Sequence, residues 1–241
     1  MKANERIITA LDLRGFNEIL NLIDSLEDAV WFKLGAVNFT AYGTKLVDEI
    51  KKRDKKLFLD LKYHDIPNTV KESVYAAAEL GVDMLTIHAF GGIEMMQAAS
   101  DAVKEFEDKH SKPGPLILAV TVLTSFNDEN LKEYMFINQT VQETVLKLAE
   151  NAKKADIKGL VASAKETKML RDNFGDYFTI VTPGIRPAWA SKGDQKRVTT
   201  PKDAIELGSS YMVIGRPIYK SENPKEAFEK IRKEIEDVNA G

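Results

Sequence analysis

Two oppositely charged side chains stand two positions apart where an apolar run ends, in the stretch 57–69. Asp60 and Lys62 are separated by Leu61, so on an extended strand they point to the same face, about 6.5 Å apart along the backbone. An acid and a base on a buried face are costly to remove from water unless they pair or bind a charged ligand. The pair is therefore a candidate for acid–base chemistry or for holding a charged ligand.

Further charges lie at the same level of the predicted sheet. Asp12 closes the first predicted strand and Lys33 lies on the second, while Asp60 and Lys62 lie on the third and Asp65 follows it. Each residue taken alone would be interpreted as a surface salt bridge or a helix cap. Three consecutive strands that place charges at one level favour a shared site instead.

Short β-branched runs alternate with segments of helical period along the chain. The strand runs are mostly apolar, which is typical of a parallel sheet covered on both faces. The predicted strands are Ile7–Leu11, Val30–Leu34, Leu57–Leu61, Met84–His88, Leu116–Leu123, Gly159–Ala162, Phe178–Val181 and Tyr211–Ile214. The predicted helices include Gly43–Lys52, Pro67–Leu80, Gly92–Phe106, Val141–Lys154 and Pro224–Glu236.

This alternation predicts an α/β fold, a (β/α)8 TIM barrel, because eight strand–helix units in 241 residues match the usual size of that barrel. A doubly wound open sheet is the alternative. It is weakened because polar residues follow nearly every strand, as they would if all the strand ends faced one mouth. No linker or repeat interrupts the pattern, so we expect one domain over residues 1–241.

Composition excludes several classes of protein. The formal charge of −3 argues against nucleic acid as the main partner. The absence of cysteine excludes disulfides, thiolate metal sites and a cysteine nucleophile. There is no signal-peptide pattern and no apolar run near the roughly 20 residues that cross a bilayer, so we expect a cytoplasmic protein without a membrane partner. The charged run 51–56 is interpreted as a solvated turn.

Two arginines follow the last two predicted strands. Arg186 lies in the loop after the seventh strand, and Gly215-Arg216 comes directly after the eighth. An isolated Gly-Arg would be interpreted as a helix start with a surface arginine, but these two loops commonly form the phosphate site of TIM barrels. Glycine admits backbone N–H groups to a phosphate, and arginine offers a bidentate fork. The long stretch 183–200 that follows strand seven is a candidate lid.

The stretch that carries Asp60 and Lys62 resembles the signature of the orotidine monophosphate decarboxylase family. Other segments resemble that family in the same order over essentially the whole chain. The matching segments are Ala10-Leu11-Asp12, Phe32-Lys33-Leu34-Gly35, Asp60-Leu61-Lys62-Tyr63-His64-Asp65-Ile66-Pro67-Asn68-Thr69, Val122-Leu123-Thr124-Ser125, Pro183-Gly184-Ile185-Arg186-Pro187, Gly193-Asp194-Gln195-Lys196-Arg197 and Ile214-Gly215-Arg216-Pro217.

The resemblance implies decarboxylation of orotidine 5′-monophosphate to UMP and CO2, the last step of de novo pyrimidine nucleotide synthesis, by a bacterial-type, monofunctional homodimer. It implies no metal and no cofactor. Lys62 would protonate the C6 carbanion and Asp60 would lie against the departing carboxylate. Lys33 would hold Asp60 and the ribose, and Asp65 would complete the charged network from the partner subunit.

The resemblance also implies the remaining substrate contacts. Asp12 and, across the dimer, Thr69 would bind the ribose hydroxyl groups. Gln195 would bridge from the lid toward the pyrimidine and phosphate. The other substrate-binding residues implied are Ile66, Thr124, Ser125, Pro183, Arg186, Gly215 and Arg216.

Two alternative functions remain. A Mg²⁺-dependent sugar-phosphate decarboxylase of the same barrel type shares the Asp-x-Lys-x-x-Asp core, but the Ile66–Thr69 continuation and Gln195 favour the nucleotide enzyme. The three histidines, His64, His88 and His110, do not show metal-ligand spacing. A non-catalytic barrel that binds a phosphorylated ligand is the second alternative; it would have no need to crowd acids and bases together at a desolvation cost of several kcal/mol per ion.

Overall fold

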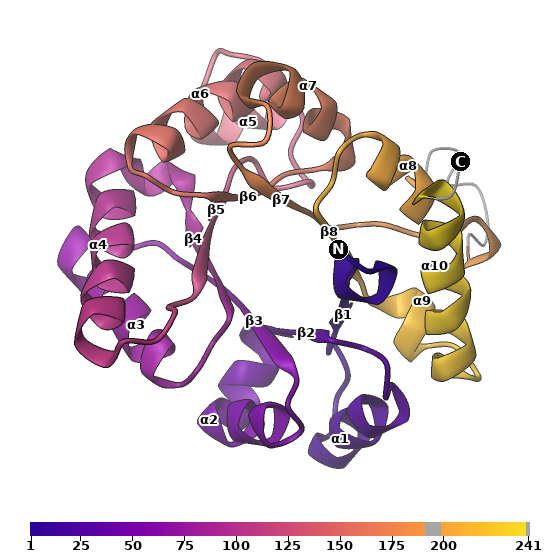
Figure 1. Cartoon of the computed structure of the whole chain (residues 1–241). Helices are drawn as coiled ribbons and strands as arrows, with labels where there is room; N and C mark the ends of the chain where they lie inside the picture. Colours follow the sequence, from indigo (N-terminus) through magenta and orange to yellow (C-terminus); the bar gives the residue numbers. More distant parts are fainter. Residues whose placement is uncertain (191–198, 240–241) are drawn as a thin grey trace.

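Eight parallel strands form a closed barrel in the computed structural model, which describes residues 1–190 and 199–239. The strands pair in chain order, and β8 closes the barrel by pairing with β1. Figure 1 shows the strands around the centre with the helices outside them. The TIM barrel predicted from the sequence is confirmed. The strands are β1 Ile7–Ala10, β2 Trp31–Gly35, β3 Lys56–Tyr63, β4 Met84–His88, β5 Leu116–Val120, β6 Gly159–Val161, β7 Thr179–Thr182 and β8 Tyr211–Ile214.

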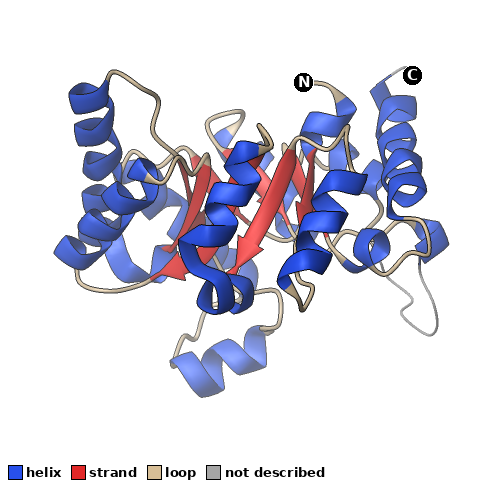
Figure 2. Ribbon diagram, turned by 90° about the horizontal axis from the view of Figure 1, so that it is seen from below, coloured by secondary structure: helices blue, strands red, loops and turns tan. Residues whose placement is uncertain are grey.

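Helices surround the barrel (Figure 1) and lie against its outer face in side view (Figure 2), so most strand residues are buried. Local signals set several helix starts. Thr140 and Glu143 form a capping box at the start of α6, and Pro67 takes the first position of α3, where its missing N–H costs nothing. The α-helices are α1 Phe16–Ser25, α2 Ala36–Lys52, α3 Pro67–Glu79, α4 Gly92–His110, α5 Asp128–Met135, α6 Val141–Lys154, α7 Ala164–Phe174, α8 Pro201–Glu206, α9 Arg216–Tyr219 and α10 Pro224–Asn239. Short 3-10 turns are η1 Ala3–Arg6, η2 Ala89–Gly91 and η3 Ala188–Ala190.

The apolar core has two parts, inside and outside the barrel. The large outer cluster packs strands against helices. The inner cluster takes one buried residue from most strands and is made of Ile8, Trp31, Phe58, Met84, Leu118 and Val181. This filled layer leaves the level above it, toward the carboxyl ends of the strands, for polar side chains.

Element bounds from the sequence are correct at some ends and wrong at others. The strands predicted at Met84–His88 and Tyr211–Ile214 have those bounds. The predicted strand Leu116–Leu123 is too long, because the chain leaves the sheet after Val120. The helix predicted from Gly43 begins seven residues earlier at Ala36, and Gly43 itself forms a kink with φ of 54°.

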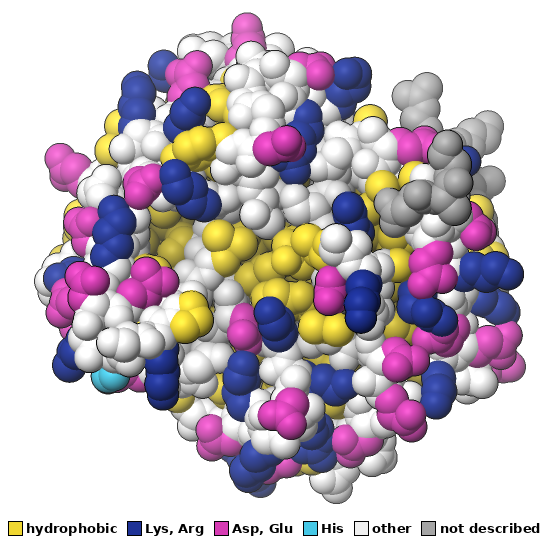
Figure 3. Space-filling model, in the orientation of Figure 1, with side chains coloured by type: hydrophobic (Ala, Val, Ile, Leu, Met, Phe, Trp, Pro, Cys, Tyr) yellow, Lys and Arg dark blue, Asp and Glu magenta, His cyan; other side chains and the backbone are white. Residues whose placement is uncertain are grey.

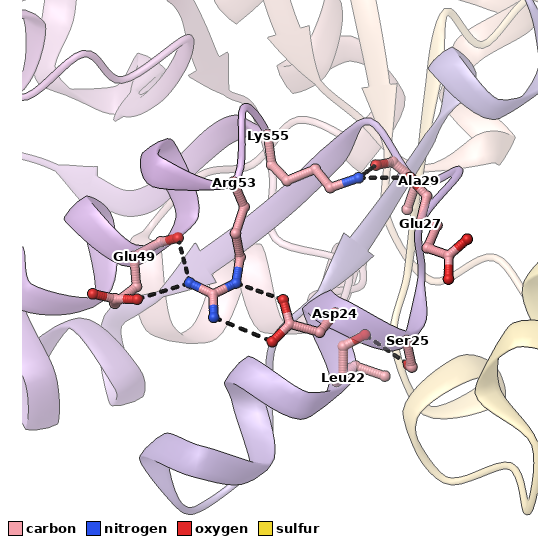
Figure 4. Close-up of polar contacts among 8 residues, drawn as sticks. All are labelled: Leu22, Asp24, Ser25, Glu27, Ala29, Glu49, Arg53 and Lys55. Atoms are coloured by element: carbon pink, nitrogen blue, oxygen red, sulfur yellow. Dashed lines mark hydrogen bonds and ion pairs between the residues drawn. The ribbon is translucent and has the colours of Figure 1, made fainter.

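The charged run 51–56 is not a simple solvated turn. The Arg53 guanidinium donates to the Asp24 carboxylate at 2.6 and 3.1 Å and to the Glu49 carboxylate at 2.7 Å (Figure 4). Lys55 donates to two backbone carbonyl groups in the turn after α1. The run therefore ties α1 and α2 together at the point where β3 begins.

The end of the barrel on which η1 lies has apolar side chains at its centre and charged side chains of both signs around them (Figure 3). Among the described residues, no helix combines the length and the apolar character that crossing a membrane requires.

Candidate active site

Four charged side chains of alternating sign lie in a row at the carboxyl ends of β1, β2 and β3. We call them the charged row: Asp12, Lys33, Asp60 and Lys62. Lys33 Nζ lies 3.5 Å from Asp12 Oδ1 and 3.4 Å from Asp60 Oδ2. Lys62 Nζ donates to the other oxygen of Asp60, Oδ1, at 2.7 Å. The structure therefore brings together four of the charged residues singled out from the sequence.

Asp60 is the centre of the row, and its side chain is only 14% exposed. Burial by itself raises the pKa of this carboxyl group, but the ammonium groups of Lys33 and Lys62 and hydrogen bonds from Lys62 and Thr86 lower it further, so that the pKa lies below its ordinary value. Asp60 is thus a largely buried, ionised carboxylate flanked by two cations.

Gly35 leaves space for part of the row. A Cβ at this position would lie 3.2 Å from Lys33 Nζ and 3.6 Å from Asp12 Oδ1. The loop that carries Asp12 is fixed by its neighbour Leu11, whose carbonyl accepts a hydrogen bond from Asn38 of α2 and whose N–H donates to the Lys33 carbonyl at 3.0 Å.

The pairing of β3 with β4 is irregular beside the charged row. Leu59 pairs with Leu85 and Tyr63 pairs with Ile87, so three residues of β3 lie opposite Thr86 alone. Such a bulge leaves backbone groups without ladder partners and changes the direction of side chains, and bulges are common beside active sites.

Lys62 lies in this bulge with φ of 54°, a left-handed conformation that is uncommon for a residue with a side chain. Its backbone N–H donates to Thr86 Oγ1 at 2.9 Å, and the Thr86 hydroxyl donates to Asp60 Oδ1 at 3.1 Å. The juxtaposition of Lys62 and Asp60 therefore comes from the bulge and not from the regular strand alternation that the sequence predicts.

Two adjoining cavities open over the charged row. The larger, of about 750 Å³, extends from Asp12 and Lys33 to Arg186 and Arg216. The smaller, of about 200 Å³, has Lys62 in its wall. Both are lined by Lys33, Asp60, Val122, Leu123, Thr124, Ser163, Pro183 and Val213. Together they have the size expected for a small-molecule site.

The far end of the larger cavity is formed by the loops after β7 and β8. Gly184 has φ of 79°, which lets the chain turn sharply after Pro183. The backbone N–H of Arg186 donates to the Thr199 carbonyl at 3.0 Å, which joins the two ends of the long loop. At Gly215 a Cβ would lie 3.2 Å from the Tyr219 ring.

Comparison with known proteins places this architecture in a family. The family model described as "Orotidine 5′-phosphate decarboxylase / HUMPS family" matches residues 5–231. The chain belongs to this family.

Relatives and solved structures agree with this assignment. A protein of Shewanella sediminis named orotidine 5′-phosphate decarboxylase is 49% identical over 233 residues, which are 96% of this chain and 97% of that protein. One of the same name from Moorella thermoacetica is 46% identical over 99% of this chain and 95% of its own length. The crystal structure of orotidine 5′-phosphate decarboxylase from Lactobacillus acidophilus superposes with a TM-score of 0.85 at 38% identity, covering 96% of this chain and 99% of that one.

The cavities are lined by most of the residues that the family resemblance implied for the site. Beside the charged row these are Thr124, Pro183, Arg186, Gly215 and Arg216.

Other residues implied by the resemblance do not line the cavities of this single chain. Asp65 is exposed, and its carboxylate accepts the N–H of Ile66 at 2.7 Å. Ile66 is 66% exposed, Thr69 and Ser125 are also exposed, and none of the four lines either cavity. Gln195 lies outside the described residues.

Several residues in or beside the site were not predicted from the sequence. Ser163 and Glu166, at the start of α7, line the larger cavity and hydrogen-bond to each other. Thr86 is only 1% exposed and contacts two members of the charged row. A polar residue in the apolar run Met84–Ile87 is the signal that could have indicated Thr86.

Two histidines lie beside the site. The rings of His64 and His88 contact each other with centroids 5.4 Å apart and are tilted by 39°. Burial, together with the neighbouring His64 and Lys62, lowers the pKa of His88, so this ring is neutral at pH 7. Within residues 1–190 and 199–239, no group of three histidine or acidic side chains is arranged to hold a metal ion.

Proposed function

We propose that this chain decarboxylates orotidine 5′-monophosphate to UMP and CO2, in the synthesis of pyrimidine nucleotides, and that it does so without a metal or an organic cofactor. The observation that carries the proposal is the charged row, in which Lys62 Nζ is held 2.7 Å from a buried carboxylate at the wall of a cavity. The near full-length similarity to proteins named for this activity supports it.

In the proposed reaction the bond between C6 of the pyrimidine and the carboxylate carbon breaks, and its electron pair stays on C6. C6 has no neighbouring carbonyl group in the ring, so the charge cannot be delocalised by simple enolate formation. The Lys62 ammonium stabilises the developing carbanion electrostatically and then transfers a proton to C6. Lys62 is left neutral and regains its proton from solvent.

Asp60 and Lys33 would prepare this step. Asp60 would face the substrate carboxylate, and their repulsion is relieved as CO2 leaves; transition-state stabilisation by Lys62 is the larger contribution, because the value of ground-state repulsion is contested. Lys33, 3.4 Å from Asp60 and 3.5 Å from Asp12, would hold both carboxylates. Asp12 would then bind a ribose hydroxyl.

The nucleotide would lie along the larger cavity with its phosphate at the far end. Arg186 and Arg216 offer planar donor groups there, and Gly215 lets the backbone approach. Thr124 and Pro183 line both cavities, next to the space for the base. Following the family resemblance, we assign Ser125 to the edge of the base and Gln195 to a bridge toward the pyrimidine and the phosphate.

We also propose that the working enzyme is a homodimer in which Asp65, Ile66 and Thr69 reach the neighbouring chain's site. Their exposure and their absence from the cavity lining of their own chain support this. Mixing inactive Lys62→Ala and Asp65→Ala proteins should restore part of the activity, because one site of the heterodimer has both residues. No recovery despite demonstrated subunit exchange would contradict the shared site.

The activity is tested by following the ultraviolet absorbance of orotidine 5′-monophosphate with the purified protein in EDTA, and by identifying UMP by chromatography. Turnover in EDTA supports the proposal. Turnover of a sugar phosphate that requires added Mg²⁺ would favour the sugar-phosphate decarboxylase. Tight UMP binding without turnover would favour a non-catalytic barrel.

A further inference from the structure

Thr86 is a buried polar residue that contacts two members of the charged row and that the proposed mechanism does not use. Its neighbours in β4 alternate between the two parts of the core: Met84 belongs to the inner cluster, while Leu85 and Ile87 belong to the outer one. Thr86 therefore points into the barrel, one level above Met84, at the level of the charged row.

The Thr86 hydroxyl links two groups of the site in one hydrogen-bonded path. It accepts the Lys62 backbone N–H at 2.9 Å and donates its own proton to Asp60 Oδ1 at 3.1 Å. Asp60 Oδ1 is also the atom that accepts from Lys62 Nζ at 2.7 Å. A hydroxyl group has one donor and two acceptor positions, so both contacts form at once.

The bulge makes this link necessary. Because three residues of β3 face Thr86 alone, the Lys62 N–H has no regular ladder partner. Lys62 also has φ of 54°, and a residue with a side chain remains in that conformation only when its surroundings stabilise it. The Thr86 hydroxyl supplies this stabilisation and fixes the Asp60 carboxylate in the same contact.

We propose that Thr86 is a positioning residue, whose hydroxyl sets the backbone of Lys62 and the carboxylate of Asp60 so that the Lys62 ammonium is aligned with the reacting carbon. The proposal rests on the proposed function, and it adds a residue that touches neither substrate nor reacting atoms. Thr86 acts on the chemical step through Lys62 and Asp60, and substrate binding depends on other residues.

The test compares Thr86→Val, which removes the hydroxyl at nearly constant shape, with Thr86→Ser, which retains it. The matched control is Thr9→Val on β1: Thr9 is fully buried, and its hydroxyl has no hydrogen-bond partner among the described residues. Circular dichroism establishes that each variant is folded. If valine prevents folding, Thr86→Ala serves as the variant without a hydroxyl.

Thr86→Val should lower kcat on the order of 10- to 100-fold, the range expected when catalytic groups are displaced by up to an ångström. KM should change less than about threefold, because the lost interaction acts on the chemical step. Thr86→Ser should keep kcat within about threefold of wild type, since the hydroxyl remains. Thr9→Val should leave both constants unchanged.

Two results would overturn the proposal: a Thr86→Val enzyme as active as Thr9→Val, or a Thr86→Ser enzyme as impaired as Thr86→Val, which would indicate packing rather than the hydroxyl. Wild-type protein without any turnover would instead reject the proposed function. In that case ¹³C NMR titration of the Asp60 carboxyl decides: its pKa should be higher in Thr86→Val than in wild type, and an unchanged pKa would overturn the positioning role.

Discussion

Replacing Lys33 by methionine should cost more stability than replacing Lys62, although Lys62 is the proposed proton donor. Lys33 is 12% exposed and lies between two carboxylates, 3.4 Å from Asp60 and 3.5 Å from Asp12. Lys62 is 36% exposed and contacts Asp60 alone within the row. Lys33, the more buried cation, therefore contributes more to the free energy of unfolding than Lys62.

The magnitude follows from these distances. At an effective dielectric constant near 20, unit charges 3.4 Å apart attract by about 5 kcal/mol. Much of this is offset, because the desolvation of a buried ion such as Lys33 costs several kcal/mol. Lys33→Met should therefore lower the free energy of unfolding by about 1–3 kcal/mol. Lys62→Met should cost about 0–1 kcal/mol, because solvent screens its charge and Lys33 still neutralises Asp60.

Urea unfolding at pH 7 measures both effects, at one fixed protein concentration because association changes apparent stability. Lys52→Met is the control: Lys52 is 68% exposed and pairs with Glu49 on the surface, so its loss should not change the unfolding midpoint. The reasoning is refuted if Lys62→Met destabilises the protein as much as Lys33→Met, or if Lys33→Met behaves like Lys52→Met.

Three further changes test other parts of the structure. The pKa of Asp60 is lowered in the folded protein, so its carboxylate stabilises the fold above the unfolded pKa of about 3.9, and this stabilisation is lost as the pH falls through the folded pKa. The Tm difference between wild type and Asp60→Asn should therefore shrink toward pH 2. A Tm difference that stays constant with pH would be inconsistent with the ion pairs. Arg53→Ala breaks the contacts with Asp24 and Glu49 and should lower the free energy of unfolding, measured in urea, by about 1 kcal/mol. An unchanged free energy of unfolding would mean that these contacts do not stabilise the fold. Thr9→Val replaces a buried hydroxyl without a partner and should raise the unfolding free energy by about 1 kcal/mol; a clear loss would mean that the hydroxyl is satisfied after all.

The barrel was predictable from the sequence because its signals are local. The apolar runs and helical periods repeat along the chain, and each is readable in a short window. The end of β5 was not predictable in this way. Val122 and Leu123 are apolar although the strand ends at Val120, because both line the cavities. Apolar side chains alone do not distinguish a strand from a cavity wall.

The site was predictable in its residue types but not in its geometry. Strand alternation predicted that Asp60 and Lys62 lie together, and they do, but their contact comes from a bulge that depends on the register with β4. No local pattern requires a positive φ at a lysine, so the sequence did not indicate Thr86, whose hydroxyl accepts the Lys62 N–H. In the proposed homodimer the position of Asp65 would be set by contacts with a second chain, which one sequence does not encode locally, so its role stays a prediction.

The central claim is that Lys62 protonates C6 in a site that needs no metal. The most direct measurement compares turnover of orotidine 5′-monophosphate by wild type and by Lys62→Ala in EDTA, with UMP affinity measured for both. Wild type should be fully active, and the variant should bind UMP but lose at least about 1000-fold in kcat, since it lacks both the cation and the proton donor. A Lys62→Ala enzyme that retains substantial turnover would contradict the account.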